Sequence, residues 1–205
     1  HKQMVRLGEG AFTTKHLAEA AMSRTIDAMR NMAEICRGYG VSEIKAVATA
    51  AVRDAVNGAA FVDRAEADSG IRLEVIPGLE EARLIHLGVA TGLPDSDRIR
   101  LFIDIGGGST ELIVGKGRKF LHLDSLKLGS VRVSSAFPEV SAPPAVPAET
   151  YGEICKHVRN GSLRSVHKLR EWKIERMVGS SGTIQNLAEI AARREKHAKG
   201  QRAAK

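Results

Sequence analysis

LFIDIGGGSTELIV, at residues 101–114, places three consecutive glycines between two apolar runs, with an acidic residue on each side of the turn. This order predicts a strand, a glycine turn and a second strand. Glycine has no Cβ atom, so the amides of Gly106, Gly107 and Gly108 can approach an anion closely, and the hydroxyl of Ser109 adds a donor. The stretch therefore predicts a phosphate-binding turn.

Two carboxylates flank this turn. Asp104 ends the first predicted strand and Glu111 opens the second. Carboxylates beside a phosphate repel it unless a hard cation such as Mg²⁺ (magnesium) lies between them. We therefore predict a metal site at Asp104 and Glu111, and phosphoryl transfer or phosphoanhydride hydrolysis as the chemistry. A strand follows the glycines where the dinucleotide fingerprint and the P-loop need a helix, which favours the hairpin phosphate loop of the actin, Hsp70 and sugar-kinase superfamily.

A second turn of the same character lies downstream. A short apolar strand around Met177 leads into a glycine- and serine-rich turn, and a helix-compatible run follows it. Amides at a helix N-terminus carry partial positive charge and bind anions. An ordinary Ser/Thr cap after a glycine turn is the alternative. Coming after the first loop, the turn is expected to face the same ligand through Gly179, Ser180, Ser181, Gly182 and Thr183.

Four blocks together resemble the exopolyphosphatase / guanosine pentaphosphate phosphohydrolase (Ppx/GppA) family of this superfamily. They occur in the family's order and are residues 48–57 (ATAAVRDAVN), residues 75–85 (VIPGLEEARLI), the loop at 104–111 and the turn at 179–184. Residues 5–10 and 128–132 are weaker likenesses. The resemblance covers most of the chain, and the combination is far more specific than any single block.

The resemblance implies an α/β, ribonuclease H-like (actin-like ATPase) fold of two domains, with the active site in the cleft between them. We expect residues 1–86 to be the remainder of the first ribonuclease H-like domain and residues 87–205 to be the start of the second. The family's opening strand and its Asp-x-Gly-Ser-Asn-Ser loop are not found in this sequence. The sequence also ends soon after the helix predicted to follow Gly182. We therefore expect both domains to be incomplete and these residues alone to be inactive or nearly so.

The resemblance also implies the roles of two charged residues. Glu80 and Glu81 both fall in the first turn of a predicted helix, where acids complement the helix dipole. Only the resemblance selects Glu81, as the general base that activates the attacking water. Arg53 alone suggests a solvated surface charge, whereas in the family the arginine of this block reaches the substrate phosphate, which suits a planar guanidinium.

The implied activity is that of an exopolyphosphatase or guanosine-5'-triphosphate,3'-diphosphate pyrophosphatase. Such a hydrolase releases terminal phosphate from inorganic polyphosphate, or converts pppGpp to ppGpp, with Mg²⁺ as cofactor. The expected ligand is inorganic polyphosphate or guanosine penta/tetraphosphate. A non-catalytic sensor of these ligands is an alternative, because every phosphate-binding feature would serve binding equally well. An ATP-dependent kinase of the same superfamily is another alternative, and a homodimer is left open.

Composition fits a soluble cytoplasmic enzyme. The chain is 43% hydrophobic with a mean hydropathy of −0.16, and no apolar run approaches the roughly 18 residues that span a bilayer. No membrane association is therefore expected. Cys36 and Cys155 lie far apart without a CxxC or His cluster, so neither a zinc site nor a redox motif is predicted.

The net charge of +7 is concentrated in residues 156–173 and 193–205. One interpretation is a solvated helix face followed by a frayed end, and the alternative is guidance of a long polyanion toward the cleft. No aromatic interleaving and no nucleic-acid module accompany the charge, so a nucleic-acid partner is not expected.

Periodicity and turn residues predict the other elements. Helices are expected at 13–37, 61–67, 79–89 and 149–170, further strands at 44–48, 71–76 and 120–128, and a proline-rich loop at 140–148.

Overall fold

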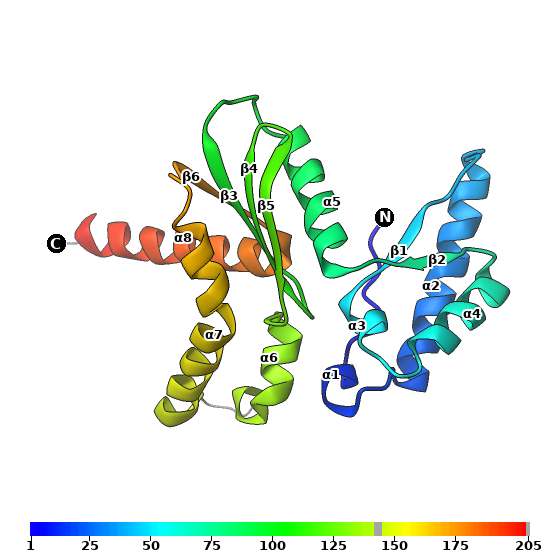
Figure 1. The fold of residues 1–205 in the computed structure, drawn as a ribbon. Helices are drawn as coiled ribbons and strands as arrows, with labels where there is room; N and C mark the ends of the chain where they lie inside the picture. The colour runs from blue at the N-terminus through cyan, green and yellow to red at the C-terminus, as the bar shows by residue number, and fades with distance from the viewer. Residues whose placement is uncertain (142–144, 204–205) are drawn as a thin grey trace.

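The computed structural model describes residues 1–141 and 145–203 and shows two lobes joined by helix α5 (Gly78–Thr91) (Figure 1). The first lobe contains α1 (Ala11–Thr14), α2 (Glu19–Gly38), β1 (Ala46–Ala48), α3 (Ala50–Arg53), α4 (Gly58–Ser69) and β2 (Leu73–Val75). The second contains β3 (Ile99–Ile105), β4 (Thr110–Lys116), β5 (Lys119–Leu126), α6 (Ser130–Ala136), the 3₁₀ helix η1 (Pro138–Ser141), α7 (Ala148–Leu169), β6 (Arg176–Ser180) and α8 (Ser181–Ala203).

The second lobe is built on a four-stranded sheet with the strand order β5-β4-β3-β6. Strands β3, β4 and β5 pair in antiparallel fashion, and β6 lies parallel to β3. The glycine turn connects β3 to β4, so the predicted hairpin is confirmed. The mixed α/β architecture expected from the sequence is confirmed as well.

Both faces of this sheet are covered, which explains the nearly continuous apolar runs of β3 and β4. On one face, Phe102 and Ile113 pack against Ala82 of α5 and are almost fully buried. On the other face, Leu101 and Val114 belong to a cluster that includes residues at the end of α7. Successive strand residues alternate between the two faces, so α5 lies over the face that carries Phe102.

The first lobe has its own core around Phe61 of α4 and a two-stranded parallel sheet of β1 and β2. The single helix expected over residues 13–37 is wrong, because the chain leaves the helical conformation between α1 and α2. Lys15 adopts a left-handed conformation with φ of 61°. The side-chain amide of Asn57 then bonds both the backbone N–H (2.8 Å) and the backbone C=O (3.0 Å) of Leu17, which holds this segment extended.

The remaining predictions differ from the structure mainly at their boundaries, but α3 and α6 were not expected. The loop predicted at 140–148 includes residues 142–144, which lie outside the described residues, and its other end is the start of α7. The domain boundary expected after residue 86 falls within α5 and stays a prediction. In the described part of the chain, no helix has both the length and the hydropathy of a membrane span.

Candidate functional site

A row of four polar side chains crosses the sheet beside the glycine turn. Asp104 of β3 lies directly opposite Glu111 of β4 and also pairs with Ser180 of β6. Glu111 in turn lies opposite Ser125 of β5. Because partners in register share a face, all four side chains lie on the face of the sheet that α5 covers. Each is two residues along its strand from an apolar residue of that face.

Hydrogen bonds fix both carboxylates of this row. The hydroxyl of Ser180 donates to Oδ2 of Asp104, and that of Ser125 donates to Oε1 of Glu111 at 2.9 Å. The structure thus brings the two predicted metal ligands together. Sequence reasoning missed Ser125, whose only signal is its position in a strand next to Glu111.

Glu111 is 1% exposed. Burial raises the pKa of its carboxyl group above the ordinary value, since the charged form loses hydration. The hydroxyls of Ser109 and Ser125 oppose this rise in pKa, whereas the negative charges of Glu81 and Asp104 add to it. Glu81 and Asp104 therefore both lie close enough to Glu111 to repel its charged form, and a cation beside Glu111 would relieve this repulsion.

The glycine turn is held from one side by the start of α6. The backbone N–H of Ser130 donates to the carbonyl of Gly106 (2.9 Å), and the backbone N–H of Arg132 donates to that of Gly107 (3.0 Å). The carbonyl of Gly108 accepts from Nε of Arg132 at 2.7 Å. All three glycine carbonyls therefore point toward α6.

This arrangement determines where the amides of the turn point. In a trans peptide the N–H lies opposite the preceding C=O, so the N–H groups of Gly107, Gly108 and Ser109 face away from α6. The N–H of Gly106 is used within the turn, where it donates to the carbonyl of Ser109 at 3.0 Å. The amides of Gly107, Gly108 and Ser109 are therefore available to a phosphate, whereas the predicted amide of Gly106 is not.

A cavity of about 610 Å³ adjoins the turn and is lined by both lobes. Its walls include the whole Gly106–Ser109 turn, Phe12, Ala50 and Glu81. The contact between the lobes is tight, because a Cβ atom on Gly108 would lie 2.5 Å from Cβ of Ala50 and 2.7 Å from Cζ of Phe12. Glycine at position 108 therefore permits the close approach of the turn to the first lobe.

Glu81 and Glu80 differ in their surroundings, although both lie in the first turn of α5. Glu81 lines the cavity and pairs with Nη1 of Arg53 at 3.4 Å, and both side chains are largely buried. Arg53 also donates to the carbonyl of Ile76 at 2.8 Å. Glu80 instead forms a two-bond ion pair with Arg83 of its own helix. The geometry separates two acids that the residue pattern alone left equivalent.

The start of α5 also approaches the polar row. A Cβ atom on Gly78 would lie 2.4 Å from Oγ of Ser125 and 3.8 Å from Nη2 of Arg53. The first turn of α5, which carries Glu81, is therefore packed between the sheet and the end of α3.

The second predicted phosphate segment, residues 179–183, lies next to Asp104 and does not form part of the cavity wall. Gly179 and Ser180 end β6, whereas Gly182 and Thr183 belong to the first turn of α8. Ser181, with φ of 79°, donates through Oγ to the carbonyl of Ile105 at 2.9 Å. The 610 Å³ cavity is lined by other residues, so the structure joins this segment to Asp104 through Ser180 and not to the glycine turn.

Arg132 links the lobes beside the turn. Its Nη2 pairs with Oδ2 of Asp54, which follows α3, and its guanidinium carbon lies 4.2 Å from the ring centre of Phe12. Burial opposes ionisation of Asp54, but the hydrogen bond from Arg132 and nearby positive charges outweigh it and lower the pKa of Asp54. Sequence reasoning missed this contact, although both residues lie in segments that resemble the family, at 48–57 and 128–132.

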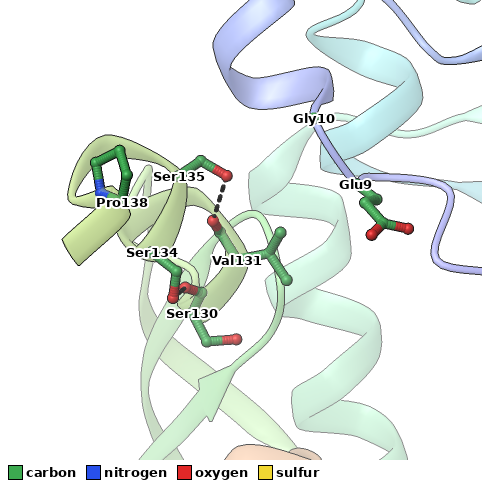
Figure 2. Close-up of a pocket in the computed structure, with 7 residues that line it drawn as sticks. All are labelled: Glu9, Gly10, Ser130, Val131, Ser134, Ser135 and Pro138. Atoms are coloured by element: carbon green, nitrogen blue, oxygen red, sulfur yellow. Dashed lines mark hydrogen bonds between the residues drawn. The ribbon is translucent and has the colours of Figure 1, made fainter. Parts of the chain in front are cut away.

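A second hollow, of about 470 Å³, shares Glu9 and Val131 with the lining of this cavity. Figure 2 shows Glu9 on one wall and the serines of α6 on the other. The hydroxyls of Ser134 and Ser135 donate to carbonyls of their own helix at 2.8 Å. These hydroxyl protons are already used within the helix, so the hollow offers fewer free hydrogen-bond donors than the cavity at the glycine turn.

Within the described residues, no three side chains of the His, Cys, Asp and Glu types form a ready metal cage. The opposed pair of Asp104 and Glu111 still suits Mg²⁺, which is usually held by one or two carboxylates together with waters and substrate oxygens. The donor set thus fits Mg²⁺, and the pair lies beside the 610 Å³ cavity, because neither carboxylate is among the residues that line it.

Comparison with known proteins shows which family the chain is similar to. The chain matches the Ppx/GppA phosphatase family over residues 1–203. It is 36% identical over 189 residues to a Photobacterium profundum protein named guanosine-5'-triphosphate,3'-diphosphate pyrophosphatase, covering 92% of this chain and 37% of that protein.

Two solved structures are also similar. An exopolyphosphatase from Cytophaga hutchinsonii superposes with a TM-score of 0.87 at 30% identity, over 96% of this chain and 62% of that one. The Aquifex aeolicus Ppx/GppA family member gives a TM-score of 0.69 at 30% identity, over 92% and 59% of the two chains. The chain spans less than two thirds of the length of each relative. It belongs to the Ppx/GppA phosphatase family and has the actin-like, ribonuclease H-like fold of that family.

Proposed function

We propose that the intact protein is a Mg²⁺-dependent phosphoanhydride hydrolase that releases terminal phosphate from inorganic polyphosphate or converts pppGpp to ppGpp. The names of the relatives, a pyrophosphatase and an exopolyphosphatase, support this class of reaction. The observation that carries the proposal is that Glu81 and the glycine turn line one cavity. The turn would bind phosphate groups and not a nucleoside, so the proposal includes both substrates.

Binding of the terminal phosphate would rest on the turn. The N–H groups of Gly107, Gly108 and Ser109 would donate to its oxygens, and they are already oriented by α6. Such oriented amides stabilise the charge that develops in phosphoryl transfer without reorganising during the reaction.

Glu81 would act as the general base. The carboxylate takes a proton from water while the water oxygen forms a bond to the terminal phosphorus. The bridging P–O bond breaks, and its electron pair leaves with the shortened phosphate chain. Arg53 pairs with Glu81 in this structure. A bound phosphate would compete for the guanidinium and leave the carboxylate free to accept the proton.

Asp104 and Glu111 would hold Mg²⁺. When bound there, the ion would neutralise charge on the phosphate oxygens. Ser180 and Ser125 would keep the two carboxylates oriented through the hydrogen bonds they donate.

The test is a Glu81→Gln substitution in the intact protein. Removing a positioned base typically costs about 10²–10⁴ in rate, so kcat should fall by that factor with little change in KM. Glu80→Gln is the matched control, because Glu80 has the same charge one residue earlier but pairs with Arg83. It should keep most of the activity.

Release of phosphate from polyphosphate and from pppGpp should be measured side by side. A Glu81→Gln protein with the wild-type rate would refute the assignment of the base. Tight binding of both ligands by the wild-type protein, without hydrolysis when Mg²⁺ is supplied, would favour a sensor. Production of ADP from ATP in the presence of an acceptor would favour a kinase.

A further inference from the structure

A separate cavity of about 370 Å³ opens at the other end of the same sheet face. It is formed by the segment after α5 and by the starts of β3 and β6, and is lined by Leu93, Pro94, Asp95, Ser96, Arg98, Arg100, Arg176 and Val178. It shares no lining residue with the cavity that contains Glu81. Arg100 and Asp104 are four residues apart on one strand, so the two regions are separated by about 13 Å.

Arg100 is the unusual residue of this cavity, because it is only 6% exposed. Its Nη2 donates to the carbonyl of Pro94 at 3.1 Å, and its Nε has no hydrogen-bond partner among the described residues. A guanidinium cannot be deprotonated in a protein, and burying a charge without a counter-ion is costly. A bound anion would therefore stabilise the buried guanidinium of Arg100.

Two further arginines increase the positive charge. Arg176 is paired in register with Arg100 on the neighbouring parallel strand, and Arg98 lies two residues before Arg100. Like charges on adjacent strands repel each other. Within the described chain, none of these three arginines pairs with a carboxylate.

One acid, Asp95, also lines the cavity and offsets only one of the three positive charges. Oδ1 of Asp95 accepts a hydrogen bond from the backbone N–H of Ser96 at 2.9 Å. The nearby Asp97 pairs with Lys116. The lining residues therefore keep an excess of positive charge that includes a buried guanidinium.

We infer that this cavity is a binding site for a phosphate-type oxyanion, distinct from the catalytic cleft. Guanidinium groups match the oxygen spacing of a phosphate and bind it with two parallel hydrogen bonds. Arg98 and Arg176 are exposed and can close on the anion from the rim, with Arg100 at the base. The ligand is either free phosphate or a phosphate at the end of a larger molecule. The inference does not depend on the proposed hydrolysis.

The test is calorimetric titration of the intact protein at constant ionic strength. Inorganic phosphate represents the free anion, and a methylene-bridged diphosphonate represents a phosphate on a larger molecule that cannot be hydrolysed. In the double variant Arg98→Ala/Arg176→Ala, the affinity of one class of binding sites should fall at least about tenfold. This is the effect of losing one charge-assisted hydrogen bond. Arg159→Ala, an exposed arginine on α7, is the matched control and should bind as the wild type does.

A second variant separates this site from the cleft. Arg53→Ala should weaken only the binding that belongs to the cleft and leave the class lost in Arg98→Ala/Arg176→Ala intact. Phosphate should also raise the Tm of the double variant less than it raises that of the wild type, relative to NaCl at equal ionic strength. If the double variant binds both probes as tightly as the wild type, or if Arg53→Ala alone removes all binding, the second site is refuted and the proposed hydrolase stands unaffected.

Discussion

Arg132 of α6 and Asp54 at the end of α3 form an ion pair between the two lobes, with side chains only 14% and 17% exposed. The same arginine holds the carbonyl of Gly108 through Nε. Asp54 directly follows Arg53, which pairs with Glu81. The guanidinium of Arg132 therefore connects the glycine turn with the segment that carries Arg53, the other candidate for phosphate binding.

Arg132→Ala should loosen this connection. We expect kcat to fall by up to about 100-fold, because the amides of the turn lose the support that aims them at the substrate and small misplacements are costly. A double-mutant cycle with Asp54→Ala should give a coupling of about 0.5–3 kcal/mol in the free energy of unfolding. The exposed pair Arg64–Glu19 is the matched control, and its coupling should be clearly weaker because solvent screens it. Equal coupling in the two pairs would contradict the role of Arg132.

Gly108→Ala should damage both stability and activity. The new methyl group would meet Ala50 and Phe12 within 2.7 Å, and overpacking of this kind costs about 1–3 kcal/mol. Gly152→Ala is the control, because a Cβ at that position in α7 meets no atom within 4 Å. It should instead stabilise the helix by about 0.5–1 kcal/mol. Thermal unfolding and phosphate release of both variants check this prediction, and an active, stable Gly108→Ala protein would contradict it.

The glycine hairpin was predictable from the sequence because its signals are local. Two apolar runs of strand length and three successive glycines specify strand, turn and strand within residues 101–114. The pairing of Asp104 with Glu111 then follows from the short turn, which fixes the register. No long-range information is needed for these features.

The contact between Arg132 and Asp54 was not predictable in this way, because 78 residues separate the two. Helix α6 has seven residues, too few for a clear helical period. The break at Lys15 depends likewise on Asn57, which is distant in sequence. Periodicity identifies elements, whereas contacts between lobes are set by packing that a single sequence does not display.

Ser125→Ala should weaken the response to Mg²⁺. The hydroxyl orients the buried carboxylate of Glu111 at 2.9 Å, and losing such a supporting group typically costs about 10–100-fold in metal affinity. A titration of phosphate release with Mg²⁺ should therefore show a half-saturation point raised by about that factor, with activity recovered at high Mg²⁺. Ser162→Ala on the exposed face of α7 is the control. An unchanged titration in Ser125→Ala would argue against Glu111 as a ligand.

His86 of α5 is expected to make the stability of the fold depend on pH, separately from the cavity that Glu81 lines. His86 is 1% exposed, and its ring forms a T-shaped contact with that of Phe102, with ring centres 4.8 Å apart. Nε2 has no hydrogen-bond partner in the described chain. Burial lowers the pKa of His86 below its usual value, although a backbone hydrogen bond with Gly117 opposes the shift. The folded protein therefore favours the neutral imidazole.

Stability should accordingly fall as the pH drops below about 6.5, the ordinary pKa of histidine in an unfolded chain. Below that pH the unfolded state binds a proton at His86 that the folded state resists, so acid favours unfolding. His86→Leu removes the titrating group at similar volume and should flatten the pH dependence by at most about 1.4 kcal/mol per pH unit. Urea unfolding of wild type and variant at pH 7.5 and 5.5 measures the two slopes. Identical slopes would show that His86 has the same pKa in the folded and unfolded states and would contradict this prediction.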